Sequence, residues 1–389
     1  MSVNGRMWWI VAGLSLGPAV SNGFARFAYG LILPAMREDL HWTYTQAGWI
    51  NTANAIGYLA GAVLALAMIG RFGARRLFIA GLVVTTLALF LSGLTRDFWA
   101  LTVWRVLAGI GGAPVFIAGG AMASALFPDD QRRNALAISI YFCGGGLGML
   151  LTGLTLPWLL EATDPGLWPW AWLAIGVASV VACVPSVWSA LCGVNPRQAT
   201  RTERAVRLPM MAMAPALASY FLFGIGYIIY MTFLVAWMRA GGAGWQLVSL
   251  TWSVMGVMVM LSPFVWRRAV TRAAGGGALS VTILGSGLGV LAAVALGGEA
   301  GAVFSAFLFG ACFFIVPTAA TAFGRRNLDE TQWGASLALF TTVFSLGQII
   351  GPVGAGAIAD QAGGIREGLL VSAAILVMAA AVGAAQRRL

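Results

Sequence analysis

Charge is scarce in this chain of 389 residues, and lysine is absent, so that all 23 basic residues are arginines. Only 9% of the residues are charged and 60% are hydrophobic, whereas roughly 25% of an ordinary soluble domain is charged. There is one histidine, and the four cysteines lack the spacing of a metal site. This composition excludes an ordinary soluble domain and predicts a membrane protein.

The apolar residues fall into twelve stretches, each near the roughly 20 residues that a helix needs to cross the hydrocarbon layer. Because the stretches are continuous and lack the alternation of barrel strands, we expect an all-α membrane protein with twelve transmembrane helices. The expected helices are 8–36, 44–69, 77–95, 99–126, 135–160, 169–192, 213–238, 244–266, 277–297, 301–323, 333–358 and 367–386.

The arginines outside these helices are distributed unevenly between the two sides of the membrane. With a cytoplasmic N-terminus, seventeen arginines fall on the cytoplasmic side and four on the other. Short cytoplasmic loops collect positive charge, so we expect a multi-pass protein of the bacterial inner membrane with both termini in the cytoplasm. The net charge of +10 then reflects topology and attraction to anionic membrane lipid, and no nucleic-acid partner is expected.

The longest polar interruption, 193–212, divides the chain into two halves. We expect six-helix bundles at 1–192 and 213–389, joined by a cytoplasmic linker. A shift of 203 positions aligns glycines of the fifth and eleventh helices, which predicts pseudo-symmetric halves. Parallel repeats of this kind place a substrate site near the membrane midplane between the halves.

Two arginines, Arg26 and Arg105, lie deep inside apolar segments with no carboxylate at their depth. A charge at membrane depth is a functional-site hypothesis, and an unbalanced guanidinium suits a carboxylate or phosphate. Arg26 shares a helix face with Asn22 and Tyr29, which could complete an anion pocket. Two structural alternatives stay open: Arg26 could cap backbone carbonyls, and Arg105 could be a hydrogen-bonding hub.

Several short motifs carry a resemblance to a known family. The segment Gly70–Arg76, between the second and third expected helices, resembles the loop signature of the major facilitator superfamily, with Gly70 where an acid is usual. Arg105, Gly109, Gly111 and Pro114 match its helix-four motif. Gly347–Pro352 resembles its antiporter motif, and Asn22–Met36 is similar to the opening of the YbfB/YjiJ-type bacterial branch. The resemblance implies two six-helix bundles and transport by alternating access.

The remaining candidate residues are polar or aromatic positions within the helices, and glycine-rich segments that could move. For substrate binding they are Asn54, Tyr58, Tyr227, Tyr230, Trp252, Phe313, Phe344 and Gln348. For gating they are Gly70, Arg71, Gly73, Arg75, Gly144, Gly148, Gly347, Gly351 and Pro352. The aromatic residues could equally be core, and most tryptophans lie near helix ends as interfacial anchors.

The sequence lacks a converging nucleophile, base and orienting group, so we expect neither an enzyme nor a metal or cofactor site. All thirteen acids fall in loops or at helix ends. Coupling to a proton would therefore use an acid such as Asp39, Glu161 or Asp360, or the substrate itself, and exchange for a counter-anion stays open. We predict a monomeric carrier of a small organic anion. The alternative is an efflux antiporter for amphipathic drugs or metabolites, with an aromatic-lined cavity.

Overall fold

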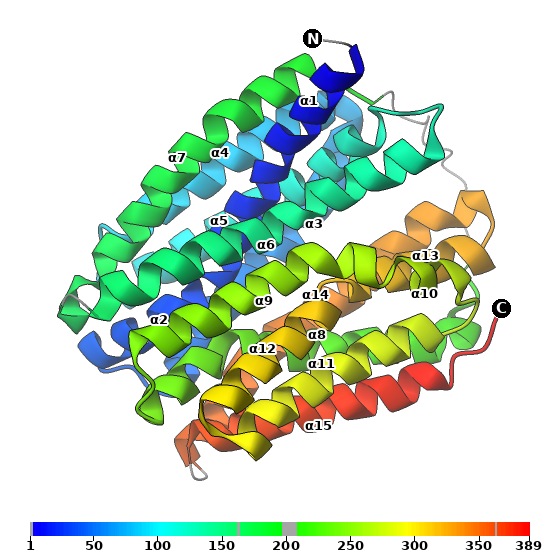
Figure 1. The fold of residues 1–389 in the computed structure, drawn as a ribbon. Coiled ribbons are helices and arrows are strands. Elements are labelled where there is room, and N and C mark those ends of the chain that lie inside the picture. Colours follow the sequence, from blue (N-terminus) through cyan, green and yellow to red (C-terminus); the bar gives the residue numbers. More distant parts are fainter. Residues whose placement is uncertain (1–2, 162–163, 197–207, 362–363) are drawn as a thin grey trace. The chain divides into compact units, whose positions relative to one another are not determined.

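The computed structural model describes residues 3–161, 164–196, 208–361 and 364–389, and these ranges are helical without any strand (Figure 1). The first half contains α1 (Val3–Pro18), η1 (Ala19–Phe27), α2 (Tyr29–Asp39), α3 (Tyr44–Phe72), α4 (Ala74–Ser92), α5 (Phe98–Ser124), α6 (Gln131–Glu161), η2 (Pro165–Leu167) and α7 (Trp168–Cys192). The second half contains α8 (Met210–Ala240), α9 (Trp245–Val265), α10 (Arg267–Arg272), α11 (Gly277–Leu296), α12 (Gly298–Phe313), α13 (Val316–Asn327), η3 (Glu330–Gln332), α14 (Trp333–Gln361) and α15 (Ile365–Ala384).

Eleven of the described helical segments are long and apolar enough to cross a membrane, and they match the second to twelfth predicted helices. The first predicted helix corresponds to α1, η1 and α2, which follow one another with only Ala28 between η1 and α2. On α7, Val177, Val181 and Val184 are 56%, 66% and 70% exposed. Such an apolar surface suits contact with lipid. The predicted all-α membrane fold is confirmed.

The first helix, predicted as one piece over 8–36, is interrupted. Residues Ala19–Phe27 wind as a π-helix, in which Ala28 N donates to Gly23 O, five residues earlier, at 3.0 Å. The change begins directly after Pro18, which has no N–H for an α-helical bond. Long π-helical segments are rare and occur often at functional sites, and this one carries Arg26.

The tenth predicted helix, 301–323, is also interrupted. α12 ends at Phe313, and α13 begins at Val316 after a two-residue turn. Pro317 cannot donate to the Phe313 carbonyl, and its ring crowds that carbonyl, so the helix cannot continue through this point.

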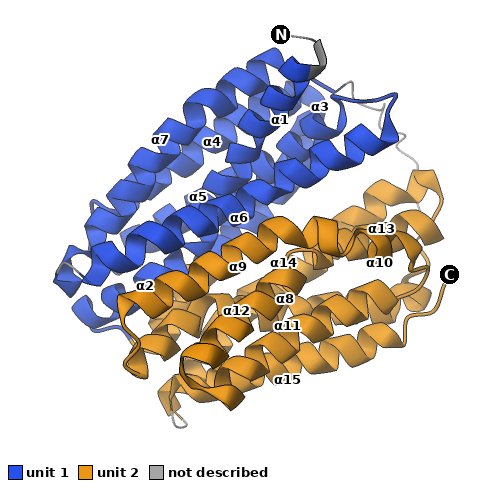
Figure 2. Ribbon diagram, viewed as in Figure 1, with its two compact units in different colours: residues 1–42, 53–201 blue, residues 43–52, 202–389 orange. Residues whose placement is uncertain are grey.

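The chain divides into two compact units (Figure 2). Unit 1 comprises residues 1–42 and 53–201, and unit 2 comprises residues 43–52 and 202–389. The start of α3 therefore belongs to unit 2, although the rest of that helix belongs to unit 1. Of the predicted linker 193–212, residues 197–207 lie outside the described residues, and α8 begins at Met210.

The glycine spacing shared by the two halves has the same physical cause in each unit. In unit 1, a Cβ on Gly148 of α6 would lie 2.6 Å from the carbonyl oxygen of Ala19. In unit 2, a Cβ on Gly351 of α14 would lie 2.7 Å from the carbonyl oxygen of Ile225 on α8. Glycine lets these helix backbones approach closely, as is common between membrane helices.

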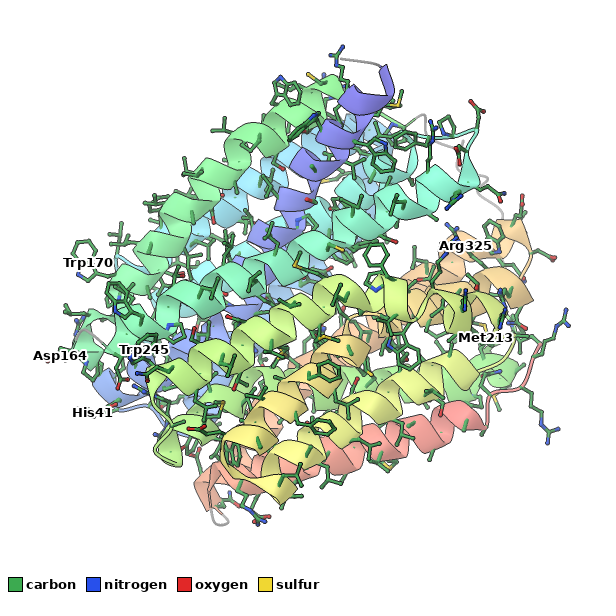
Figure 3. All side chains as sticks on the ribbon, in the orientation of Figure 1. His41, Asp164, Trp170, Met213, Trp245 and Arg325 are labelled. Carbon is green, nitrogen blue, oxygen red and sulfur yellow. The ribbon has the colours of Figure 1, made fainter. Side chains whose placement is uncertain are left out.

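The two ends of unit 2 differ in charge. Arg325 and Met213 lie at one end, and Trp245 lies at the other (Figure 3). Arg326 Nη1 donates to Ala273 O at 2.7 Å. This hydrogen bond places α10, which carries three arginines, at the same end as Arg325. We call this end, which carries Arg267, Arg268, Arg272, Arg325, Arg326, Arg387 and Arg388, the arginine-rich end of unit 2.

Candidate functional site

Arg26 is the centre of the first group of predicted site residues, which lies in unit 1. It projects from η1, is 5% exposed, and holds its guanidinium carbon 4.8 Å from the ring centroid of Tyr58 on α3. Its Nε and Nη2 atoms are buried and have no hydrogen-bond partner among the described residues. These two atoms form one edge of the guanidinium, and that edge can bind both oxygens of a carboxylate side by side.

Arg105 on α5 is a second buried guanidinium, only 1% exposed. Its Nη1 donates to the carbonyl oxygen of Ala25 at 2.5 Å, next to Arg26 in the chain. Its guanidinium carbon lies 5.4 Å from the Tyr29 ring and 5.1 Å from the Trp172 ring. Nε and Nη2 again lack partners among the described residues. Arg105 therefore anchors the π-helical segment, while the Nε–Nη2 edge of its guanidinium remains able to bind an anion.

The other predicted residues of unit 1 lie around Arg105 and η1. Asn54 Nδ2 donates to the backbone carbonyl of Arg105 at 3.1 Å. Asn22 Nδ2 lies 3.4 Å from the hydroxyl oxygen of Ser21. The Tyr29 ring stacks on Trp172, with centroids 6.5 Å apart. Trp172 was not predicted as a site residue; its position one helical turn after Trp168 was the available signal.

Aromatic stacking forms the second group, which lies in unit 2. The Tyr227 ring of α8 lies 5.5 Å from Phe344 of α14 and 5.9 Å from Phe313 of α12, with interplanar angles of 12° and 16°. Gln348 Nε2 donates to the Tyr227 hydroxyl, while Gln348 Oε1 is buried without a partner among the described residues. Phe223, not identified from the sequence, stacks on Tyr227 at 5.0 Å from the preceding turn of α8.

The remaining predicted aromatic residues of unit 2 have other neighbours. The Tyr230 hydroxyl lies 2.6 Å from Ser305 Oγ, and the Tyr230 ring packs 4.2 Å from Phe309. Tyr230 thus joins α8 to α12. Trp252 of α9 is fully buried, and its Nε1 has no hydrogen-bond partner within the described ranges.

The predicted gating loop between the second and third helices is shorter than expected. Gly70 and Arg71 belong to the last turns of α3, and only Gly73 separates α3 from α4. Gly73 has φ of +80°, a value that favours glycine. Arg75 Nη2 donates to Gly193 O at 2.9 Å, which ties α4 to the end of α7.

The other predicted gating residues lie on α6 and α14. Gly144 of α6 meets the backbone of Ser15, and Gly347 of α14 meets the backbone of Phe221. The carbonyl of Pro352 faces Gly48, in the part of α3 that belongs to unit 2.

Asp360, at the end of α14, caps the start of α3 within unit 2. Its carboxylate accepts hydrogen bonds from Tyr44 N at 2.8 Å, from Thr45 N at 2.9 Å and from Thr45 Oγ1 at 2.6 Å. A carboxylate at a helix N-terminus satisfies free N–H groups and complements the helix dipole. Asp360, predicted as a possible proton-exchanging acid, therefore serves as a helix cap.

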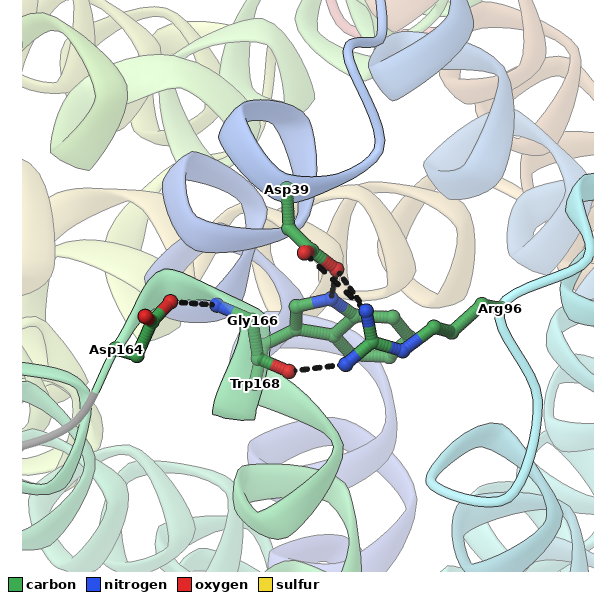
Figure 4. A network of polar contacts seen from close by, with 5 residues as sticks. All are labelled: Asp39, Arg96, Asp164, Gly166 and Trp168. Atoms are coloured by element: carbon green, nitrogen blue, oxygen red, sulfur yellow. Dashed lines mark hydrogen bonds and ion pairs between the residues drawn. The ribbon is translucent and has the colours of Figure 1, made fainter.

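Asp39, another such candidate, lies in a polar network with Arg96, Gly166 and Trp168 (Figure 4). Its carboxylate forms an ion pair with Arg96 at 3.0 Å and accepts a hydrogen bond from Trp168 Nε1 at 2.8 Å. Arg96 Nη2 also donates to Gly166 O at 2.5 Å. Trp168 is fully buried, so the interpretation of this tryptophan as an interfacial anchor was wrong: its ring packs inside unit 1, and its N–H has an acceptor in Asp39.

The arrangement in unit 1 is suited to holding an anion. The guanidinium of Arg26 projects from the π-helical segment, and that of Arg105 donates a hydrogen bond to the same segment. Both groups are buried, and neither forms an ion pair with a described carboxylate. The stacked rings of unit 2 offer an apolar surface with an amide and a phenol beside it. These two groups, one in each unit, are the candidate binding sites of a multi-pass membrane protein.

The family is shown by sequence. Residues 18–384 match the family described as "Uncharacterised MFS-type transporter YbfB", and the chain belongs to this family. The predicted resemblance is confirmed. A solved structure supports the fold: the crystal structure of the nucleoside transporter NupG has a TM-score of 0.70 and 13% sequence identity, over 96% of this chain and 98% of that one.

Curated relatives are similar over part of their length. The puromycin resistance protein pur8 of Streptomyces alboniger is 26% identical over 66% of this chain and 47% of its own length. The 4-hydroxybenzoate transporter PcaK of Acinetobacter baylyi is 27% identical over 40% of this chain and 34% of its own length. The chain thus spans between a third and a half of these two relatives.

Proposed function

We propose that this protein carries a small organic anion, in the first instance a carboxylate, across the bacterial inner membrane, with Arg26 as the anion-binding residue. The observation that carries the proposal is the buried Nε–Nη2 edge of Arg26, which has no acceptor among the described residues. An unpaired buried charge costs several kcal/mol, so the site needs an anion to balance it. The similarity to a 4-hydroxybenzoate transporter supports the same class of substrate.

Alternating access is the proposed mechanism, in a monomer with both termini in the cytoplasm. Glycine contacts such as Gly148 with Ala19 and Gly351 with Ile225 let helices pack closely enough to slide. Asp39 and Asp360 are held by hydrogen bonds, and Glu161 is exposed at the end of α6. We therefore propose that charge is balanced by a proton that travels with a weak acid, or by exchange for a counter-anion.

Transport of radiolabelled benzoate into proteoliposomes tests the role of Arg26. Benzoate combines a carboxylate with a flat apolar ring, and benzamide is its neutral counterpart. Arg26→Gln should lower benzoate transport roughly 30-fold or more, because a buried charge-assisted contact contributes about 2–5 kcal/mol. Arg26→Lys should retain part of the activity, since lysine offers a charge without the planar pair of donors.

Arg6→Gln is the matched control, because Arg6 is exposed at the start of the same span. It removes one positive charge from unit 1 and should leave transport unchanged. Equal benzoate transport by the wild type and a correctly folded Arg26→Gln variant would refute the proposal. The proposal would also be refuted if the protein did not transport benzoate and if no member of a set of small carboxylates raised its thermal stability.

Export of amphipathic drugs or metabolites is the second candidate, and the stacked rings of unit 2 favour it. Tyr220, Phe223, Tyr227 and Phe344 form near-parallel contacts with centroids 4.8–6.0 Å apart. Similarity to a puromycin resistance protein points the same way. Under this reading puromycin, and not benzoate, stabilises the purified protein, and Arg26→Gln leaves that effect intact.

A further inference from the structure

A cavity lies at the arginine-rich end of unit 2, where α13 meets α14. Its volume is about 230 Å³, and its lining includes Thr321, Arg325, Trp333, Ser336, Leu337 and Phe340. Arg325 marks this end of unit 2 in Figure 3.

Arg325 gives the cavity an available cation. Its guanidinium carbon lies 5.3 Å from the ring centroid of Trp333, and no described residue forms an ion pair or a hydrogen bond with its side chain. The neighbouring Arg326, in contrast, donates to the backbone of Ala273. Trp333 is held in place, because its Nε1 donates to Leu328 O at 3.0 Å. The cavity thus combines an exposed guanidinium with a fixed aromatic wall.

The residues of α14 that line the cavity lie on the same helix face as the aromatic stack. Trp333, Leu337, Phe340, Phe344 and Gln348 are spaced by four, three, four and four residues, which places them on one helix face.

Ring contacts link the cavity to the stack. The Phe340 ring lies 5.8 Å from Tyr220, and Tyr220 stacks on Phe344 at 4.8 Å. The cavity and the stack are thus neighbours in unit 2, with Phe340 between them.

The size and chemistry of the cavity narrow its ligand. A volume of about 230 Å³ is below the roughly 300–1,000 Å³ of pockets for drug-sized compounds. The lining provides one cation, hydroxyl groups and apolar rings, which suits a small anion with a flat apolar body. A lipophilic cation would meet the positive charge of Arg325.

We propose that the Arg325–Trp333 cavity is a second anion-binding site, an access site at the arginine-rich end of unit 2. It would hold a small carboxylate by the Arg325 guanidinium, with the apolar body of the ligand against Trp333 and Phe340. This inference rests on the proposed function, since it concerns the same class of substrate before or after carriage. By the distribution of arginines, this end faces the cytoplasm.

The test compares benzoate transport from the two faces of the membrane, using inverted and right-side-out vesicles. Arg325→Gln should raise the half-saturating benzoate concentration about three- to ten-fold from the cytoplasmic face. The maximal rate from the cytoplasmic face should stay at the wild-type value. From the opposite face the half-saturating concentration should stay unchanged and the maximal rate should fall by the same factor, because a mutation cannot change the overall equilibrium that links the two directions. Arg268→Gln, which removes an arginine from the same end, is the matched control and should have no effect. Unchanged half-saturation in Arg325→Gln would overturn the inference.

Equilibrium binding separates this inference from the proposed function. In purified Arg26→Gln, benzoate should still bind with a saturable component that disappears on adding Arg325→Gln, whereas benzamide should not bind. Loss of all benzoate binding in Arg26→Gln alone would overturn the access site while leaving the Arg26 proposal intact. Wild-type transport in Arg26→Gln would refute the Arg26 proposal. The Arg325-dependent part of benzoate binding would then still test the access site by itself.

An anionic phospholipid headgroup has the same charge as the proposed ligand, so the binding experiment includes short-chain phosphatidylglycerol. The access site predicts that benzoate competes with this lipid for the Arg325-dependent component. Arg325-dependent binding of phosphatidylglycerol with no binding of benzoate would overturn the proposal and assign the cavity to lipid. Trp333→Leu should weaken benzoate more than acetate, because only benzoate has a ring to stack.

Discussion

Replacing Asp360 should release the first turn of α3, because one carboxylate satisfies three donors there. The donors are Tyr44 N, Thr45 N and Thr45 Oγ1, at 2.8, 2.9 and 2.6 Å. Losing a helix cap typically costs about 1 kcal/mol, and losing the favourable interaction with the helix dipole costs about 0.3–1 kcal/mol. Since the contact is exposed, we expect Asp360→Ala to cost about 1–1.5 kcal/mol.

Asp360→Asn should cost about half as much, because the amide keeps one acceptor oxygen and loses the charge. Glu367→Gln is the matched control, since Glu367 is also near the start of a helix but its ion pair with Arg366, at 3.8 Å, is exposed on both sides. Such a pair contributes little, so the control should change stability by less than about 0.5 kcal/mol.

Hydrogen exchange read by mass spectrometry measures this effect locally. In Asp360→Ala, amides in the peptide covering Tyr44–Asn51 should exchange up to about ten-fold faster, since 1.4 kcal/mol corresponds to a factor of ten. Amides in the middle of α5 should exchange at the wild-type rate. If exchange in this peptide is unchanged in Asp360→Ala, the cap does not hold the start of α3, and the reasoning is wrong.

Two further predictions concern packing and a buried hydrogen bond. Gly351→Val should lower the free energy of unfolding by about 1–3 kcal/mol, because the new side chain would meet the backbone of Ile225. Gly354→Val on the same helix is the control and should be tolerated, because a Cβ at Gly354 meets nothing within 4 Å. Equal losses of stability in the two variants would refute the packing argument. Trp168→Phe should cost about 0.5–1.5 kcal/mol by removing the N–H that Asp39 accepts, and denaturant unfolding that matches the wild type would contradict this.

Much of the architecture could be predicted because a bilayer restricts what a chain can do. Lipid requires backbone hydrogen bonds to close within each helix, so apolar length alone indicates a helix. The interruptions were harder to predict. Pro18 and Pro317 were visible in the sequence, but many prolines in membrane helices leave the helix continuous, as Pro114 does within α5. Whether a helix breaks depends on what its neighbours provide for the freed backbone groups.

The sequence allowed us to predict which residues form the site, but only in part which residues they contact. Arg26 stood out because a charge deep in an apolar segment is costly. Its contact with Tyr58 and the stacking of Tyr29 on Trp172 join residues on different helices, and no spacing within one helix indicates such pairs. The Arg325–Trp333 cavity was not identified, because Arg325 was assigned to a cytoplasmic loop and Trp333 was interpreted as an interfacial anchor at the start of a helix.

The amino-acid sequence was enough to show that this is a multi-pass membrane protein, that it is of the major facilitator type, and that two arginines are buried without an acid beside them. These properties follow from composition, length and local order. The tertiary structure alone decided which edge of each guanidinium lacks a partner, which rings stack, and which acids are engaged in caps and ion pairs. Those outcomes depend on distances between segments far apart in the chain, and packing sets such distances.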